Sequence, residues 1–101
     1  MRAEDAVLRG DPRRGAALVR AYGCGGCHAI PGVTGANGRV GPSLVGLAGR
    51  TTLAGRIPNT PSNLVRWIQH PQAVSPGTIM PEMGVADADA RDLAAFLLTQ
   101  R

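Results

Sequence analysis

The chain of 101 residues contains no lysine, little aromatic character and no long apolar run. No stretch approaches the roughly twenty apolar residues that a membrane-spanning helix needs, and the first residues lack the apolar segment of a signal peptide. The length allows one domain. We expect residues 1–10, which are charged and mixed, to form a mobile segment or a linker remnant, and residues 11–101 to form the folded domain.

The shortage of aromatic residues implies a thin core. Tyr22, Trp67 and Phe96 are the only aromatic residues, whereas glycine occurs 14 times and proline 8 times. A domain of this length buries only about two-thirds of the surface that its unfolded chain exposes. The protein chain alone therefore supplies little material for a core.

The two cysteines of the chain stand in the pentapeptide Cys24-Gly25-Gly26-Cys27-His28. Two thiols three residues apart, followed directly by an imidazole, are the attachment pattern of a c-type haem. On a helical turn both thiols project to one side, where they can form thioethers with the haem vinyl groups, and His28 can bind the iron. A haem would also provide the large apolar group that the core lacks.

Three other interpretations of this pentapeptide remain open at this stage. A thioredoxin-like dithiol needs a βαβ setting, and neither flank has a run of β-branched residues that could form its strand. A structural zinc site needs four ligands, and the only other strong candidate is His70, just before a proline. A plain disulfide would explain the cysteines but not His28. Haem attachment accounts for all three side chains and is the interpretation we favour.

The net charge of +4 comes from arginine alone. A basic surface suggests an acidic partner or an anionic membrane surface. Nucleic acid is the weaker interpretation, because the arginines are scattered and no nucleic-acid-binding motif accompanies them.

Three helices are expected. Asp11 and Thr60 are each followed by a proline and should cap helices that run to about residue 22 and from residue 63 to about residue 70. Asp87 should cap a last helix that ends near residue 99. Gly15 inside the first helix costs about 1 kcal/mol relative to alanine, so a close contact with another helix is expected there.

Two stretches are expected to be loops. Residues 29–59 are rich in glycine and show neither the helix nor the strand period, with at most a short helical turn at 43–47. Residues 71–84 contain Pro71, Pro76 and Pro81, which predicts a stiff loop and no helix or strand. A stiff loop that carries a methionine suits a weak axial ligand of a haem iron, because the iron–sulfur bond alone would not hold the methionine in place.

With these motifs in view, the chain resembles the class I cytochromes c over roughly residues 10–99. The matching segments occur in the order of that family, and they are Cys24-Gly25-Gly26-Cys27-His28, residues 41–50 (GPSLVGLAGR) and residues 76–80 (PGTIM). Residues 59–71 followed by 76–78 are most similar to the cytochrome c domain fused to subunit II of bacterial haem-copper oxidases of the caa3 type. Three motifs in register are more specific than the pentapeptide alone.

The resemblance implies an all-α cytochrome c fold, with three main helices and long loops around one covalently bound haem c. The haem would be attached through Cys24 and Cys27, and its iron would be bound by His28 and Met80. Met83, which lies in the same loop, does not follow residues 76–78 at the spacing of the family, and it is expected to serve packing or the surface. The last helix of the family crosses the first, which would place Phe96 against Gly15.

The resemblance also implies the surroundings of the haem. The remaining cofactor-binding residues would be Pro42, Leu44, Arg50 and Trp67. By similarity, the carbonyl of Pro42 accepts a hydrogen bond from His28 and raises the basicity of its ring. Arg50 occupies the position of an arginine near a haem propionate, and Trp67 that of an aromatic residue on the methionine side of the haem.

The expected function is one-electron transfer to or within a respiratory terminal oxidase by a haem with histidine and methionine ligands. The alternatives are a haem-based gas sensor or peroxidase with a labile methionine, and an electron-transfer domain of a dehydrogenase. We expect an electron carrier and not an enzyme, monomeric as this fragment, with redox proteins as partners, an acidic docking surface on the partner and no nucleic acid. Contact with a membrane would occur only through a missing anchor or fused subunit. By the resemblance, the location would be the periplasm or the outer face of the cytoplasmic membrane, with the export signal or anchor absent from this chain.

Overall fold

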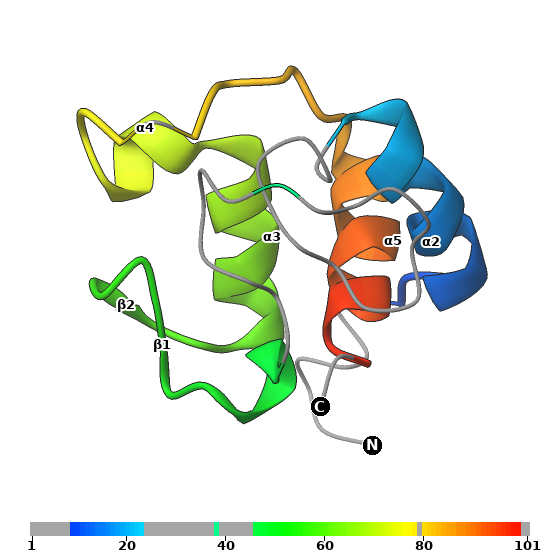
Figure 1. Ribbon diagram of the computed structural model, residues 1–101, viewed down its shortest axis with the longest axis horizontal. Helices are drawn as coiled ribbons and strands as arrows, with labels where there is room; N and C mark the ends of the chain where they lie inside the picture. The colour runs from blue at the N-terminus through cyan, green and yellow to red at the C-terminus, as the bar shows by residue number, and fades with distance from the viewer. Residues whose placement is uncertain (1–8, 24–37, 39–45, 79, 100–101) are drawn as a thin grey trace.

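The structure of the protein is a computed structural model that describes residues 9–23, 38, 46–78 and 80–99. Its helices are α2 (Pro12–Ala21), α3 (Pro61–Gln69), α4 (Pro71–Val74) and α5 (Asp87–Leu97), with a 3₁₀ turn, η2 (Leu47–Gly49). Two short strands, β1 (Thr52–Leu53) and β2 (Ile57–Pro58), pair antiparallel. Figure 1 shows α2 beside α5 on one side, α3 in the middle, and α4 and the strands on the other side.

Helix α2 begins as the sequence predicts. The side chain of Asp11 accepts a hydrogen bond from the backbone N–H of Arg13 at 2.9 Å, and Pro12 occupies the first helical position. Both features satisfy or remove N–H groups that the first turn leaves without a partner. The helix ends at Ala21 with Tyr22 as its C-terminal cap, and Gly23 follows in the left-handed conformation at φ 73°.

Helices α2 and α5 approach closely because α2 carries glycine at the contact. A Cβ atom on Gly15 would clash with the carbonyl oxygen of Asp92 and would lie 2.8 Å from the Cβ of Phe96. The expected crossing of Gly15 and Phe96 is therefore confirmed. Gly10 makes a second such contact, with the carbonyl oxygen of Arg91, just before α2 begins.

Helix α3 joins the two sides of the molecule. Thr60 caps it by accepting a hydrogen bond from the backbone N–H of Asn63 at 3.2 Å, as expected. Leu64 and Ile68 are buried on the inner face of α3. They belong to one apolar cluster that also contains Val19, Leu47, Leu53, Val85, Ala90, Leu93, Ala94 and Leu97. The core thus forms between α3 and the α2–α5 pair, with contributions from η2 and β1.

Three expectations about the elements are wrong. Asp87 does not cap α5: Ala86 occupies that position, and the Asp87 carboxylate instead pairs with Arg91, one turn along, at 3.0 Å. Residues 71–84 contain the helix α4, because Pro71 has the fixed φ that suits a first helical position. The hairpin β1–β2 lies within 29–59, and its turn places Ala54 and Gly55 at φ 53° and 64°.

The described residues contain a helical turn close to the one expected at 43–47. It is η2, which begins at Leu47, and Gly46 precedes it at φ 71°. None of the helices in the described part of the chain combines the length and the apolar character needed to cross a membrane.

Candidate haem site

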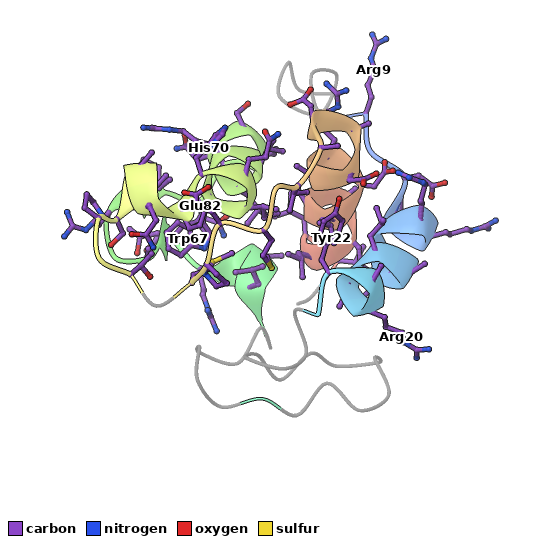
Figure 2. All side chains as sticks on the ribbon, turned by 90° about the horizontal axis from the view of Figure 1, so that it is seen from above. Arg9, Arg20, Tyr22, Trp67, His70 and Glu82 are labelled. Atoms are coloured by element: carbon purple, nitrogen blue, oxygen red, sulfur yellow. The ribbon has the colours of Figure 1, made fainter. Side chains whose placement is uncertain are left out.

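The residues expected to bind haem divide into two groups. Cys24, Cys27, His28, Pro42 and Leu44 lie outside the described residues. Arg50, Trp67 and Met80 are described, and they come from three segments: the end of η2, helix α3, and the loop that follows α4. Figure 2 shows Trp67 on the α3 side of the molecule and Tyr22 at the end of α2 on the other side.

The loop before Met80 is built on a defined turn. The backbone N–H of Thr78 donates to the carbonyl oxygen of Ser75 at 3.0 Å, and Gly77 has φ 82°. Proline at the second position, glycine in the left-handed conformation at the third and this hydrogen bond are the features of a type II turn. The part of the loop that contains Pro76, which was expected to be stiff, therefore forms a hydrogen-bonded turn.

The two methionines of this loop lie in different surroundings. Met83 packs, partly buried, against the apolar cluster that Leu64 and Ile68 belong to. Met80 is half-buried, and its backbone N–H lies 3.4 Å from the side-chain oxygen of Thr78. Met83 thus packs against the core, while Met80 lies two residues beyond the turn described above.

Several apolar side chains pack against the core and are only partly buried. Trp67 is half-buried, although its neighbours Leu64 and Ile68 on α3 are buried. The partly buried side chains packed against the core are Leu18, Tyr22, Ile57, Val65, Trp67, Met83, Phe96 and Leu98. Incomplete burial of large apolar side chains is what remains when an additional apolar group completes the core.

Arg50 lies at the end of η2, in a backbone segment that Asn59 fastens. The side-chain Nδ2 of Asn59 donates to the carbonyl oxygens of Leu47 and Arg50, both at 2.9 Å. The backbone N–H of Asn59 donates to the carbonyl oxygen of Thr51 at 3.0 Å. One asparagine thus joins the segment before α3 to the turn that carries the half-buried Arg50.

The same asparagine contains a buried atom that lacks a partner. Among the described residues, the side-chain oxygen of Asn59 is buried and accepts no hydrogen bond. Leaving a buried acceptor unpaired costs free energy, so a donor from a bound group or a water molecule would stabilise it. This atom lies beside the segment of Arg50, where the resemblance places a propionate.

The segment from Cys24 to His28 follows an anchored helix end. The Tyr22 hydroxyl, at the end of α2, donates to the carboxylate of Asp89 on α5 at 2.8 Å. The guanidinium of Arg14 donates to Asp89 at 2.7 Å and to Asp92 at 2.6 Å, and Asp92 also accepts from the backbone N–H of Asp11 at 2.7 Å. Both ends of α2 are therefore tied to α5.

These contacts shift the ionisation of the groups involved. The hydrogen bond from Tyr22, followed by that from Arg14, lowers the pKa of Asp89. The pKa of Asp92 is lowered mainly by the N–H of Asp11 and then by Arg14. The bond to Asp89 raises the pKa of the Tyr22 hydroxyl, because the phenol gives up a favourable contact when it ionises.

The sequence analysis missed Asn59, Gln69 and Gln72 as residues of this region. Gln69 on α3 donates to the carbonyl oxygen of Val85 at 3.2 Å, and Gln72 on α4 donates to the carbonyl oxygen of Thr78 at 2.7 Å. Amide side chains at these positions carry no periodic or capping signal. Only the path of the backbone reveals them.

Comparisons with known proteins cover nearly the whole chain. A family model described as Cytochrome c matches residues 12–101. The cytochrome c2 of Rhodopila globiformis is 36% identical over 103 residues, which span 89% of this chain and 93% of that protein. The matched region includes every residue that the sequence analysis assigns to haem binding.

Proposed function

The chain belongs to the cytochrome c family, and from that premise we propose that it passes single electrons through a haem iron bound by His28 and Met80. Members of this family bind one covalent haem c with its iron, and the chain is an electron carrier and not an enzyme. The mostly helical structure, with one two-stranded sheet among its described residues, agrees with the all-α cytochrome c fold.

The side chains available fit this cofactor. Two thiols at Cys24 and Cys27 can form thioethers, and the imidazole of His28 with the sulfur of Met80 makes a common axial pair. In the described part of the chain, no three histidine, cysteine, aspartate or glutamate side chains gather into a competing metal site. The half-burial of Trp67, beside the buried Leu64 and Ile68, also favours a large apolar group next to the core.

The bound haem supplies reversible exchange between ferric and ferrous iron. The residues of the chain keep the geometry constant and exclude other ligands. With His28 and Met80 both bound, no coordination position would be free for oxygen or peroxide. Arg50 would favour an ionised propionate, and Pro42 would orient His28.

The observation that carries the choice of Met80 is the different packing of the two methionines. Among the described residues, Met83 packs against the apolar cluster and Met80 does not; Met80 follows a hydrogen-bonded type II turn by two residues. A weak sulfur ligand needs a backbone fixed by its own contacts, because the iron–sulfur bond alone would not order the loop.

Replacing each methionine by alanine in the ferric holoprotein tests the assignment. A ferric haem with a methionine ligand has a weak sulfur-to-iron band in the far red. We expect Met80→Ala to abolish this band and Met83→Ala to keep it while lowering the stability of the fold. Loss of the band in Met83→Ala, with its survival in Met80→Ala, would reverse the assignment.

We also propose that the partner is a redox protein with an acidic docking surface, such as a terminal oxidase. All aspartates and glutamates lie at 4, 5, 11, 82, 87, 89 and 92, so residues 12–81 contain no carboxylate side chain. Arg56, in the hairpin, and Arg66, on α3, are exposed and have no ion-pair partner among the described residues. On the other side, Asp89 and Asp92 are paired with Arg14, and Asp87 is paired with Arg91.

The location and the form of the native protein are further proposals. Relation to a cytochrome c2 favours the periplasm. The similarity of residues 59–71 to oxidase subunit II favours a domain, residues 11–101, that is tethered to an oxidase through residues 1–10. Stopped-flow reduction of the complete native protein distinguishes the two forms. A tethered domain shows a phase that is independent of protein concentration and changes little with salt, whereas a free shuttle shows only a bimolecular phase that slows steeply with salt.

A further inference from the structure

Among the described residues, one side chain outside the expected haem site makes three hydrogen bonds to the loop that contains Met80. The side-chain Nε2 of Gln72, on α4, donates to the carbonyl oxygens of Thr78 at 2.7 Å and Met80 at 3.2 Å. Its side-chain oxygen accepts from the backbone N–H of Gly77 at 3.1 Å. The carboxamide therefore uses both ends on three residues of this loop.

The contact with Gly77 completes the type II turn. Such a turn pairs its first carbonyl oxygen with its fourth N–H, and it leaves the N–H of the third residue without a partner. Gln72 accepts from that N–H, so its oxygen supplies the bond that the turn itself lacks.

The other two contacts lie on either side of residue 79. The carbonyl oxygens of Thr78 and Met80 are both directed to one nitrogen, which has two hydrogen atoms to donate. An ionised carboxylate in place of the amide would have no donor for either carbonyl oxygen. The arrangement therefore selects an amide over a carboxylate of almost equal size.

Gln72 is itself fixed in place. Its backbone N–H, in the first turn of α4, donates to the Glu82 carboxylate at 3.1 Å. Glu82 lies two residues beyond Met80, so the loop leaves α4 and returns to its first turn. Figure 1 shows α4 and the start of this loop together at one corner of the molecule, and Figure 2 labels Glu82 beside α3 and α4.

We propose that Gln72 is a positioning residue for the axial sulfur of Met80 and that it controls how often this ligand leaves the iron. The inference rests on the proposed function, in which Met80 binds iron. Two side chains contact the backbone of Met80: Gln72, from α4, and more weakly Thr78, from the loop itself. Loss of the Gln72 amide therefore frees the loop without removing an apolar residue from the core.

Imidazole is a suitable probe, because it can bind the ferric iron only when the methionine has left. Its apparent affinity is scaled by the fraction of molecules in which the site is open. In Gln72→Met, which keeps the length of the side chain and loses its hydrogen bonds, we expect the apparent affinity of the ferric holoprotein for imidazole to rise about tenfold. The far-red band should survive in the absence of imidazole, because Met80 is still present.

Gln69→Met is the matched control. Gln69 also bonds a backbone carbonyl, that of Val85, but five residues beyond Met80 and at the entry to α5. Its replacement should lower resistance to urea to a similar degree and change the imidazole affinity less than twofold. Gln72→Glu is the second variant, and it should raise the affinity at least as much as Gln72→Met, because it loses both donors.

The outcomes separate this inference from the assignment of Met80. If Met80→Ala keeps the far-red band, the proposed ligand is wrong and the inference fails with it. If Met80→Ala loses the band and the imidazole affinity is the same in Gln72→Met, Gln72→Glu and the unmodified protein, Met80 is the ligand and the role of Gln72 is refuted. An equal rise in Gln69→Met would also refute it, because the effect would then reflect general loosening.

Discussion

Gly15 on α2 lies directly against the carbonyl oxygen of Asp92 on α5, with no room for a methyl group between them. We expect Gly15→Ala to destabilise the holoprotein, because overpacking of about 1–3 kcal/mol exceeds the helix-propensity gain of about 1 kcal/mol. Urea unfolding measures the difference. Gly49→Ala is the control, since a Cβ there meets no described residue within 4 Å. Equal stability of Gly15→Ala and the unmodified protein would contradict the close contact.

Ala54 occupies the left-handed region at φ 53°, which is unfavourable for any residue with a Cβ. We expect Ala54→Gly to stabilise the protein by about 0.5 kcal/mol, because relief of the backbone strain outweighs the greater freedom of glycine in the unfolded chain. Ala88→Gly, in the exposed first turn of α5, should instead destabilise it, by up to about 1 kcal/mol. Thermal unfolding of the two variants should therefore give shifts of opposite sign.

We expect the α2–α5 contact to weaken in acid, because it depends on the ionised carboxylates of Asp89 and Asp92. The pKa values of Asp89 and Asp92 are lowered in the folded state, so their stabilisation is complete above about pH 4, the pKa of an unfolded aspartate, and is lost as the pH falls through the folded values. Tyr22→Phe removes the largest cause of the shift at Asp89. The acid-unfolding midpoint of this variant, followed by circular dichroism, should move to higher pH.

The control for acid unfolding is Arg91→Gln, which breaks the pair with the exposed Asp87. It should leave the midpoint almost unchanged, because exposed pairs contribute little. For Tyr22, whose pKa is raised in the folded state, the pH dependence of stability runs in the opposite direction. The stabilisation is present below about pH 10 and is lost as the pH rises through the pKa of the folded state. Tyr22→Phe should therefore lack this alkaline loss. An acid midpoint that did not move would contradict the network.

The position of an exposed arginine should matter more than the net charge. Arg66→Glu and Arg9→Glu change the net charge equally, but Arg66 lies on α3 and Arg9 precedes α2, beyond α5 in Figure 2. We expect oxidation by ferricyanide, a small anion, to slow several-fold in Arg66→Glu and much less in Arg9→Glu at low salt. The difference should shrink as salt screens the charges. Equal rates in the two variants would show that electrons do not leave on the α3 side.

The parts of the fold that follow local rules could be predicted from the sequence. Asp11 and Thr60 can be recognised as helix caps because each has a side-chain oxygen and precedes a proline that suits the first helical position. Gly15 indicates a helix contact because glycine is otherwise unfavourable inside a helix. The prolines of 71–84 were ambiguous: Pro71 ends one helix and begins the next. The hairpin turn was hidden because Ala54 does not favour its conformation.

The residues of the candidate site also divide into those that the sequence indicates and those that only the structure shows. The spacing from residues 76–78 favours Met80 over Met83, and packing of Met83 against the core adds a second distinction that the sequence does not show. Asn59 and Gln72 act on backbone groups that come near them after the chain has folded, so no spacing in the sequence announces their bonds. Hydrogen bonds from side chains to backbone groups farther along the chain depend on the path that the loop takes, and the amino-acid composition does not determine that path.

The carboxamide of Gln72, a neutral group, makes three hydrogen bonds to the loop around Met80. The α2–α5 contact relies on carboxylates, a guanidinium and a phenol. With Met80 bound to iron, the hydrogen bonds from the Gln72 side chain would not change with pH, because a carboxamide does not titrate. The same fall in pH that weakens the α2–α5 contact would then leave in place the hydrogen bonds that position the sulfur.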